Sequence, residues 1–100
     1  MEIVFDPKKS LKNEIERQLP FEKVAEFVWG TAVIIEDKRF PYLEKRFSAL
    51  GFFNYRVHAI CFTPIEESYF RIISFRKANK REIKRYEKAR REEAANEQKW

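Results

Sequence analysis

The fold of this chain is decided by residues 53–75, which read FNYRVHAICFTPIEESYFRIISF. Apolar and polar side chains alternate along residues 53–63 and again along residues 69–75, with a turn predicted at residues 64–68. Successive side chains of a strand point to opposite faces of a sheet, so both segments are predicted to be strands, and their short connection makes them antiparallel. In the second strand we expect one face to carry Phe70, Ile72 and Ser74.

Two further strands are predicted upstream of this pair. Residues 31–35 are β-branched and too few for a helix, and residues 45–50 alternate before Gly51, which is expected to turn the chain. Residues 36–43 carry charges and Pro41 with no clear period, so they are predicted to form a loop.

The N-terminal segment is predicted to be helical after a short strand at residues 3–5. Asp6 followed by Pro7 is a helix start, because aspartate caps the first free N–H groups and proline suits the first helical position. Until Pro20 interrupts it, this helix is expected to turn an apolar stripe toward the core. The stripe consists of Leu11, Ile15 and Leu19.

A second helix is predicted from Phe21, with Gly30 as a left-handed stop. Its core-facing residues are Val24, Ala25, Phe27 and Val28. From Ala78 onward the chain is again strongly helix-forming. One side of this last helix is expected to be lined by Ala78, Ile83, Tyr86 and Ala89.

These elements predict an α+β fold of the order β-α-α-β-β-β-α, in which helices cover one face of an antiparallel sheet. A chain of 100 residues has room for one hydrophobic core. We therefore place a single domain at residues 1–91 and a helical or frayed tail at residues 92–100.

Positive charge is concentrated toward the C-terminus. Residues 71–91 contain ten Lys or Arg against Glu82 and Glu87, whereas the net charge of the whole chain is +5. The remainder of the chain is therefore net negative. Such asymmetry indicates one surface that attracts anions, as in proteins that bind nucleic acids.

Composition excludes several classes of site. With two glycines there is no glycine-rich phosphate loop, and with one His and one Cys there is no zinc cluster, so no metal ion or cofactor is expected. Cys61 lies in an apolar stretch and is predicted to be a small buried hydrophobe in a reducing compartment. No secretory pattern and no membrane-spanning run is seen, so we expect a cytoplasmic protein without membrane contact.

Residues 71–87, RIISFRKANKREIKRYE, resemble the C-terminal signature of the BrnT toxins, in which an RIIS-x-RKA strand end precedes a basic helix with a late R-x-Y-E. Upstream positions resemble the family at matching offsets. These are Phe5-Asp6-Pro7, Lys9, Asn13, Phe21-Glu22, and Glu44-x-Arg46 with Gly51. The resemblance extends to about Arg91 and leaves only the tail outside it.

The resemblance implies a RelE-like ribonuclease fold and toxicity through RNA cleavage. It also implies neutralisation by a cognate BrnA-type antitoxin in a toxin–antitoxin assembly that contacts DNA only through the antitoxin. Such cleavage needs no metal ion: the ribose 2′-hydroxyl attacks the adjacent phosphorus while cations stabilise the charged pentacoordinate state.

Candidate site residues follow from the cationic strand-to-helix junction and from the resemblance. Strand residues and the turn after a strand are rigidly held, so Arg46, Arg71, Arg76 and Lys77 are expected around the scissile phosphate. The residues expected to bind flanking RNA are Lys80, Arg81, Lys84, Arg85 and Lys9. Proton transfer is assigned to Tyr86 or Glu44.

Two departures from the family pattern leave alternatives open. Glu16-Arg17-Gln18 stands where many members have Lys-His-Gly, and Phe62 stands where a histidine often follows the long strand. His58 is predicted to be structural. One alternative is a catalytically silent module of the same fold that holds RNA or an antitoxin; another is a basic protein that docks on the ribosome or on DNA without chemistry.

Overall fold

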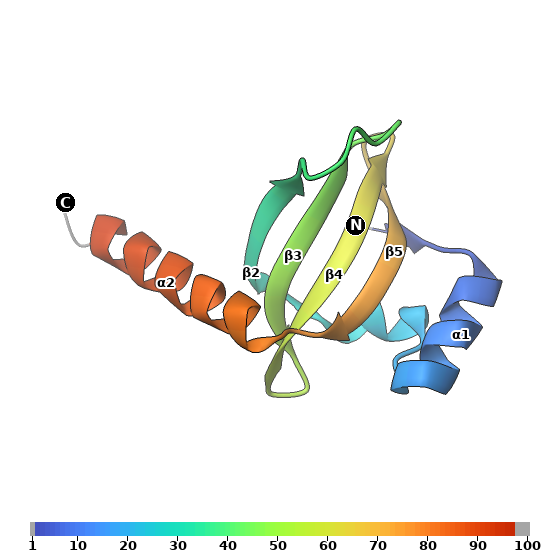
Figure 1. Cartoon of the computed structure of the whole chain (residues 1–100), viewed down its shortest axis with the longest axis horizontal. Helices are drawn as coiled ribbons and strands as arrows, with labels where there is room; N and C mark the ends of the chain where they lie inside the picture. The colour runs from blue at the N-terminus through green and yellow to red at the C-terminus, as the bar shows by residue number, and fades with distance from the viewer. Residues whose placement is uncertain (1, 98–100) are drawn as a thin grey trace.

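The computed structural model describes residues 2–97, which form a five-stranded sheet with helices at both ends of the chain (Figure 1). The elements are β1 (Glu2–Val4), α1 (Pro7–Arg17), the 3-10 helix η1 (Phe21–Glu26), β2 (Val28–Asp37), β3 (Arg46–Phe53), β4 (Arg56–Ile65), β5 (Tyr69–Lys77) and α2 (Lys80–Glu97). In the sheet the strands follow the order β1-β5-β4-β3-β2, in which β1 is parallel to β5 and the other neighbours are antiparallel.

The predicted α+β class is confirmed, and the architecture is consistent with the RelE-like fold that the resemblance implies. The predicted order β-α-α-β-β-β-α counted three strands after the N-terminal helices, although four strand segments were predicted there, and the structure contains all four. The strands predicted at residues 31–35 and 45–50 are both present and are longer, because their pairing with neighbours extends beyond the β-branched and alternating stretches.

The β3–β4 hairpin turns at Asn54 and Tyr55, not at Gly51 as predicted. Both turn residues have positive φ, 53° and 63°, which is the backbone geometry that suits a two-residue hairpin. Gly51 instead lies within β3 and pairs with His58. A Cβ at this position would lie 2.7 Å from Cζ of Phe27, so glycine is needed for the close approach of that ring to the sheet.

A β-bulge interrupts the pairing of β4 with β5. Cys61 pairs with Ser74 and Phe62 pairs with Ile72, so Ile73 is the extra residue on β5. Ile72 and Phe75 consequently face the same apolar core, with Phe70 packed against it. The prediction that Ser74 shares a face with Phe70 and Ile72 was therefore wrong, since the bulge reverses the alternation at this point.

The larger apolar core lies between the sheet and the N-terminal elements. Residues 21–26 form a 3-10 helix rather than the predicted α-helix, and Phe21, Val24 and Phe27 are buried at its three-residue spacing. Ala25 and Val28 were predicted to face the core but are exposed. Gly30, expected to end the helix, lies inside β2, and no glycine of the described chain has a positive φ.

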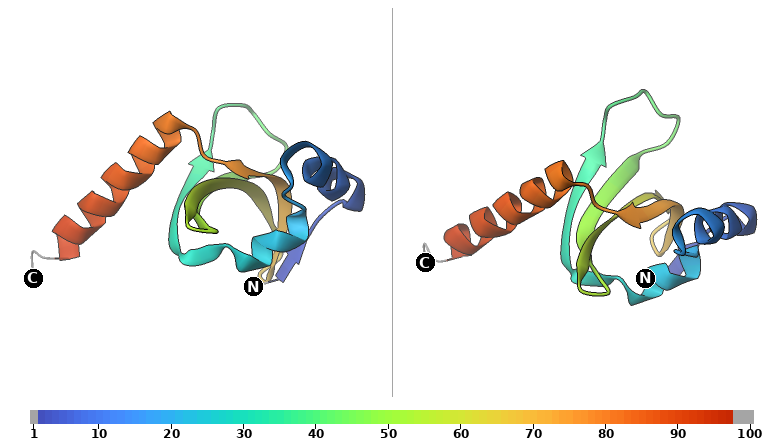
Figure 2. Two further views of the ribbon diagram at one scale, coloured as in Figure 1. Left: turned by 90° about the horizontal axis from the view of Figure 1, so that it is seen from below. Right: turned by 60° about the horizontal axis from the view of Figure 1, so that its bottom comes forward.

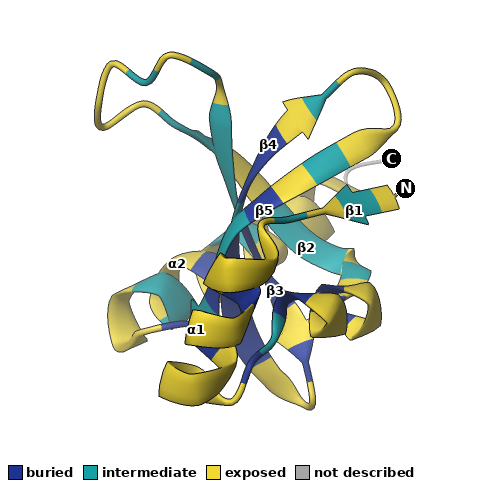
Figure 3. Cartoon of the chain, turned by 90° about the vertical axis from the view of Figure 1, so that its right-hand side faces the viewer, coloured by how far each residue is buried: buried dark blue, intermediate teal, exposed yellow. Residues whose placement is uncertain are grey.

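Helix α1 turns a polar face inward. Asp6 caps its start as predicted, accepting a 2.9 Å hydrogen bond from the Lys8 N–H. Leu11 and Ile15, predicted to face the core, are 56% and 75% exposed, and the buried residues of α1 are Ser10 and Asn13. Most of the surface of α1 is exposed (Figure 3). The apolar spacing was misleading because buried backbone groups of η1 and β5 require polar partners on this side.

Asn13 joins three segments of the chain. Its Nδ2 donates hydrogen bonds to the carbonyl oxygens of Leu19, at 2.6 Å, and Phe75, at 2.8 Å. Ser10 Oγ accepts a 2.8 Å hydrogen bond from the Phe21 N–H. Two short side chains therefore hold α1 against both the start of η1 and the end of β5.

Helix α2 packs on the other face of the sheet, against a second apolar cluster of Leu50, Val57, Ala59, Ala78 and Tyr86. The expectation that all helices share one face holds only for α1 and η1. Beyond Tyr86, α2 leaves the body of the protein, and residues 92–97 continue it as an exposed helix (Figures 1 and 2). Within the described chain no helix combines the length and apolar character needed to span a membrane.

We predict that Asn13→Ala destabilises the fold, because it leaves two buried carbonyl groups without their donor. The expected loss is about 1–3 kcal/mol in the free energy of unfolding, measured by urea denaturation. Lys12→Ala is the matched control, since Lys12 is the exposed neighbour on α1 and should change stability by less than about 0.5 kcal/mol. Equal stability of the two variants would contradict the role of the Asn13 amide.

Candidate functional site

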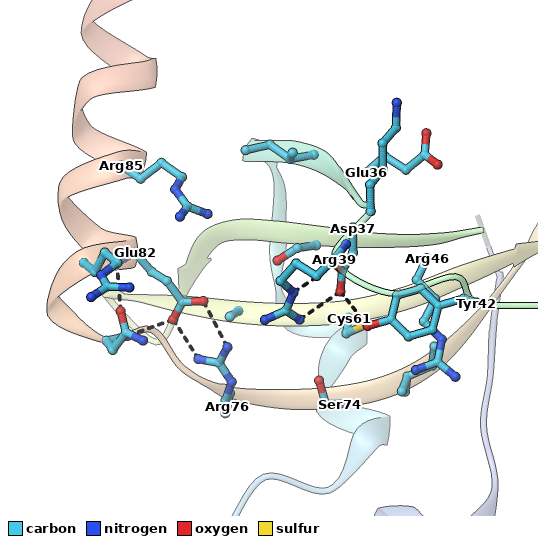
Figure 4. A pocket seen from close by; sticks show the side chains of 17 residues that line it. Glu36, Asp37, Arg39, Tyr42, Arg46, Cys61, Ser74, Arg76, Glu82 and Arg85 are labelled. Atoms are coloured by element: carbon cyan, nitrogen blue, oxygen red, sulfur yellow. Dashed lines mark hydrogen bonds and ion pairs between the residues drawn. The ribbon is translucent and has the colours of Figure 1, made fainter. Parts of the chain in front are cut away.

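The sheet face opposite the larger core forms an open hollow of about 640 Å³ (Figure 4). Its floor includes Ser48, Cys61 and Ser74, which pair with one another across β3, β4 and β5. α2 borders the hollow on one side, and the β2–β3 loop, residues 38–45, borders it on another. Six cations line it, namely Lys38, Arg39, Arg46, Arg76, Arg81 and Arg85, against the three carboxylates Glu36, Asp37 and Glu82.

Cys61 differs from the prediction of a small buried hydrophobe. It lies on the floor of the hollow and is half-buried, since its neighbours on that face are the small residues Ser48 and Ser74. Burial raises the pKa of its thiol. The neutral thiol is thus the form present near neutral pH.

Asp37 anchors the β2–β3 loop. Its two carboxylate oxygens accept hydrogen bonds from Nε and Nη2 of Arg39, both at 2.9 Å, and Oδ2 also accepts a 3.1 Å bond from the Tyr42 hydroxyl. The hydrogen bonds from Arg39 hold the pKa of the Asp37 carboxyl far below its ordinary value. Asp37 is therefore ionised and neutralises Arg39 while fixing Tyr42.

Arg46 lies between the loop and the floor. Its Cζ is 4.3 Å from the centroid of the Tyr42 ring, which is a cation–π contact, and its Nη2 is 3.4 Å from Glu44 Oε1. Its Nε is buried and has no hydrogen-bond partner among the residues that the structure describes. The aromatic ring and one long ion-pair contact therefore orient this guanidinium and only weakly compensate its charge.

Arg76 is held by the first turn of α2. Its Nη1 and Nη2 donate to the two oxygens of Glu82, at 2.7 and 2.9 Å. Glu82 also accepts a 3.0 Å bond from the Asn79 N–H, and its own N–H donates to Asn79 Oδ1 at 2.8 Å, which completes a capping box. Hydrogen bonding from Arg76 lowers the pKa of Glu82, so this carboxylate is ionised and fixes both Arg76 and the helix start.

Arg81 and Arg85 contribute positive charge to the hollow from α2. They are four residues apart on α2, so they project from the same side of the helix, and both are exposed. Between residues 2 and 97, neither forms an ion pair. These two side chains are therefore free to contact an anion that enters the hollow.

The structure brings together only part of the predicted site. The predicted residues that line the hollow are Arg46, Arg76, Arg81 and Arg85. Those that do not line it are Arg71, Lys77, Lys80, Lys84 and Lys9. Lys9 lies on α1, which is on the far side of the body from α2 (Figure 1).

The two predicted proton carriers have different surroundings. Tyr86 is buried in the smaller core and its hydroxyl donates a 2.7 Å bond to the Thr31 carbonyl, so it anchors α2 rather than facing the hollow. Glu44 lies in the loop beside Arg46 and lines a second, smaller hollow. The Glu44 carboxylate is therefore close to the guanidinium of Arg46.

The structural interpretation of His58 is confirmed. Its ring lies in T-shaped contact with Phe53, and its Nδ1 is 2.8 Å from the Arg56 carbonyl oxygen. The pKa of the imidazole is lowered, mainly because burial disfavours its charged form. His58 is therefore a neutral core residue, on the sheet face opposite Ala59 and Cys61.

The cluster of Asp37, Arg39 and Tyr42 was not predicted from the sequence, because residues 36–43 show no periodicity. The available signal was the Asp-x-Arg spacing followed by an aromatic residue, in a loop flanked by two strands. No group of three or more metal-ligating side chains is found among the described residues.

A family model described as "Ribonuclease toxin, BrnT, of type II toxin-antitoxin system" matches residues 5–82. The matched span includes the floor of the hollow, the loop cluster and the Arg76–Glu82 pair, and it ends before Arg85. No curated protein matches the chain.

We predict that Glu82→Gln removes a stabilising contribution that depends on pH. The folded pKa of Glu82 lies below its ordinary 4.5, so the contribution is present above that pH and is lost as the pH falls through the folded value. Urea denaturation at about pH 7 should show a loss of about 1–2 kcal/mol, which shrinks in acid. Glu87→Gln, an exposed glutamate of α2, is the control; a loss for Glu82→Gln that did not depend on pH would exclude the ionised pair as its cause.

Proposed function

Because the chain belongs to the BrnT family of ribonuclease toxins of type II toxin–antitoxin systems, we propose that it is a cytoplasmic endoribonuclease that binds a phosphodiester in the cationic hollow. The observation that carries this proposal is the gathering of six cations around one open hollow, with Arg81 and Arg85 unpaired within the described residues. A polyanion with regularly spaced phosphates is the ligand that such a surface attracts.

The proposed reaction uses the RNA's own 2′-hydroxyl as nucleophile. The 2′-oxygen bonds to the adjacent phosphorus, the bond to the 5′-oxygen breaks, and protons leave the 2′-hydroxyl and reach the departing oxygen. The pentacoordinate phosphorus carries extra negative charge, which fixed guanidinium groups stabilise better than water does. No metal ion is required for these steps.

Arg76 and Arg46 are the proposed groups at the scissile phosphate. The guanidinium of Arg76 has five N–H donors, and its bonds to Glu82 and to the Lys77 carbonyl use three of them. The remaining donors can contact a phosphate while Glu82 keeps the group oriented. Arg46, held by the Tyr42 ring, supplies a second cation from the opposite side of the floor.

Glu44 is the proposed proton acceptor, since it is half-exposed and contacts Arg46. Tyr86 is not proposed for this role, because its hydroxyl is engaged with the Thr31 carbonyl. As a type II toxin the chain is expected to have RNA as substrate and a cognate antitoxin as partner. We propose a BrnA-type antitoxin that mediates any contact with DNA.

A second candidate function is a catalytically silent RNA- or antitoxin-binding module. The single histidine of the chain lies in the core rather than at the hollow, and three of the six lining cations are paired with carboxylates. RNA binding without cleavage products would favour this function over the nuclease.

We predict that the hollow's arginines are required for cleavage. Purified Arg46→Ala and Arg76→Lys variants should each cleave RNA about 10²- to 10³-fold more slowly than the parent, because each removes a positioned donor. Arg76→Lys keeps a charge beside Glu82 and so limits any loss of folding, which circular dichroism checks. Arg90→Ala, on the protruding part of α2, is the control and should cleave at the parent rate. Undiminished cleavage by both hollow variants would exclude this site.

Binding to RNA is predicted to be strongly salt-dependent. Raising the salt from about 50 to 200 mM should weaken association steeply, since each neutralised phosphate releases counterions. Arg81→Ala together with Arg85→Ala should reduce the slope of the logarithm of the binding constant against the logarithm of salt concentration. A slope unchanged by the double variant would place the RNA elsewhere on the protein.

A further inference from the structure

A second hollow, of about 250 Å³, lies against the β2–β3 loop. We call it the loop hollow. Its apolar and aromatic lining residues are Phe40, Pro41, Tyr42 and Leu43. Glu36, Asp37, Lys38 and Tyr42 also line the larger hollow, so the two spaces share a wall. Nothing in the proposed cleavage chemistry uses the apolar residues of this second space.

The apolar side chains of the loop hollow are presented to solvent rather than buried. Phe40 is 61% exposed, and Leu43 is fully exposed. Neither residue belongs to the two apolar clusters that stabilise the fold. Exposed apolar side chains that meet at one short loop beside a charged hollow indicate a contact surface.

The Phe40 ring is nevertheless held in place. It makes an edge contact with the Tyr42 ring, with centroids 5.8 Å apart, and Tyr42 donates its hydroxyl hydrogen bond to Asp37. The Arg39 guanidinium carbon is 6.0 Å from the Phe40 centroid. Phe40 is thus an exposed aromatic face on an ordered support, flanked by cations from the same loop.

Aromatic faces interleaved with cations suit unpaired nucleotides, because bases stack on the rings while Arg and Lys contact the phosphates. We propose that the loop hollow binds an unpaired base whose neighbouring phosphate lies in the larger hollow, with Phe40 as the stacking residue. This inference rests on the proposed nuclease function. Only a ribose separates a base from its phosphate, so one nucleotide can occupy two spaces that share a wall. The substrate is therefore single-stranded RNA, since bases in a duplex are already stacked and paired.

Equilibrium binding of a 2′-O-methyl RNA oligonucleotide tests this proposal without cleavage. Fluorescence anisotropy is measured with the single strand and with its annealed duplex. Phe40→Ala and Phe40→Leu should each weaken single-strand binding about tenfold and leave duplex binding nearly unchanged, because both remove the aromatic face. Phe40→Trp should retain or tighten binding. Tyr55→Ala is the matched control, because Tyr55 is also a solvent-facing aromatic residue, 100% exposed, and lies in the hairpin turn that follows the other end of β3.

The outcomes separate this inference from the proposed function. Salt-dependent binding of the single strand that does not change in any Phe40 variant overturns the base subsite and leaves the nuclease proposal standing. Normal RNA binding by Phe40→Leu with a loss only in Phe40→Ala also overturns the subsite, because an aliphatic side chain would then suffice and no base stacks on the ring. If the parent protein binds neither strand nor duplex, the failure lies in the proposed function itself. Thermal unfolding confirms that each variant is folded.

Discussion

The arrangement of this protein depends on one extra residue in β5. Ile73 forms the bulge against β4, and the alternation of side chains reverses there. Without it, the face that carries Ile72 would also carry residues 74 and 76, and the Arg76 guanidinium would enter the apolar core. With it, Phe75 returns to the core while Ser74 and Arg76 reach the hollow. The bulge thus lets a single strand serve an apolar and a cationic face within a few residues.

The charges of the hollow are organised by pairing some cations and leaving others unpaired. Six cations close together repel one another, and the carboxylates of Asp37 and Glu82 relieve this repulsion at Arg39 and Arg76. The same bidentate bonds fix the orientation of these two arginines before any ligand arrives. Preorganised donors of this kind avoid reorganisation when charge develops, whereas Arg81 and Arg85, which form no ion pair among the described residues, provide long-range attraction.

The parts of the fold that sequence predicted are those fixed by local patterns. Alternation located β4 and β5, and the Asp6–Pro7 step located the start of α1. The polar inward face of α1 escaped prediction because Asn13 bonds to Phe75, which is 62 residues away. A bulge likewise leaves no trace in the spacing of apolar residues. The change of sheet face at Ser74 could therefore not be predicted from that periodicity alone.

The sequence predicted the cations that α2 and β5 contribute to the candidate site, but not the residues of the β2–β3 loop. The reason is again the difference between local patterns and tertiary contacts. Arg76, Arg81 and Arg85 belong to one contiguous basic segment, so composition alone brought them together. Asp37 and Tyr42 acquire a role only when the loop folds back over Arg46, which no sequence period encodes. Charge density can therefore reveal that a surface binds anions, but the residues that orient those charges emerge from tertiary contacts.

The capping box of Asn79 and Glu82 connects the local sequence pattern with the tertiary contacts of the site. An α-helix turns by about 100° per residue, so starting α2 one residue earlier or later would rotate Arg81 and Arg85 away from the hollow. Reciprocal bonds between Asn79 and Glu82 fix the start, and the Tyr86 hydroxyl bond to Thr31 fixes the rotation one turn later. Glu82 is also the partner of Arg76. The residue that defines where the helix begins is thus the one that orients a cation on the neighbouring strand, which couples local folding of the junction to the geometry of the site.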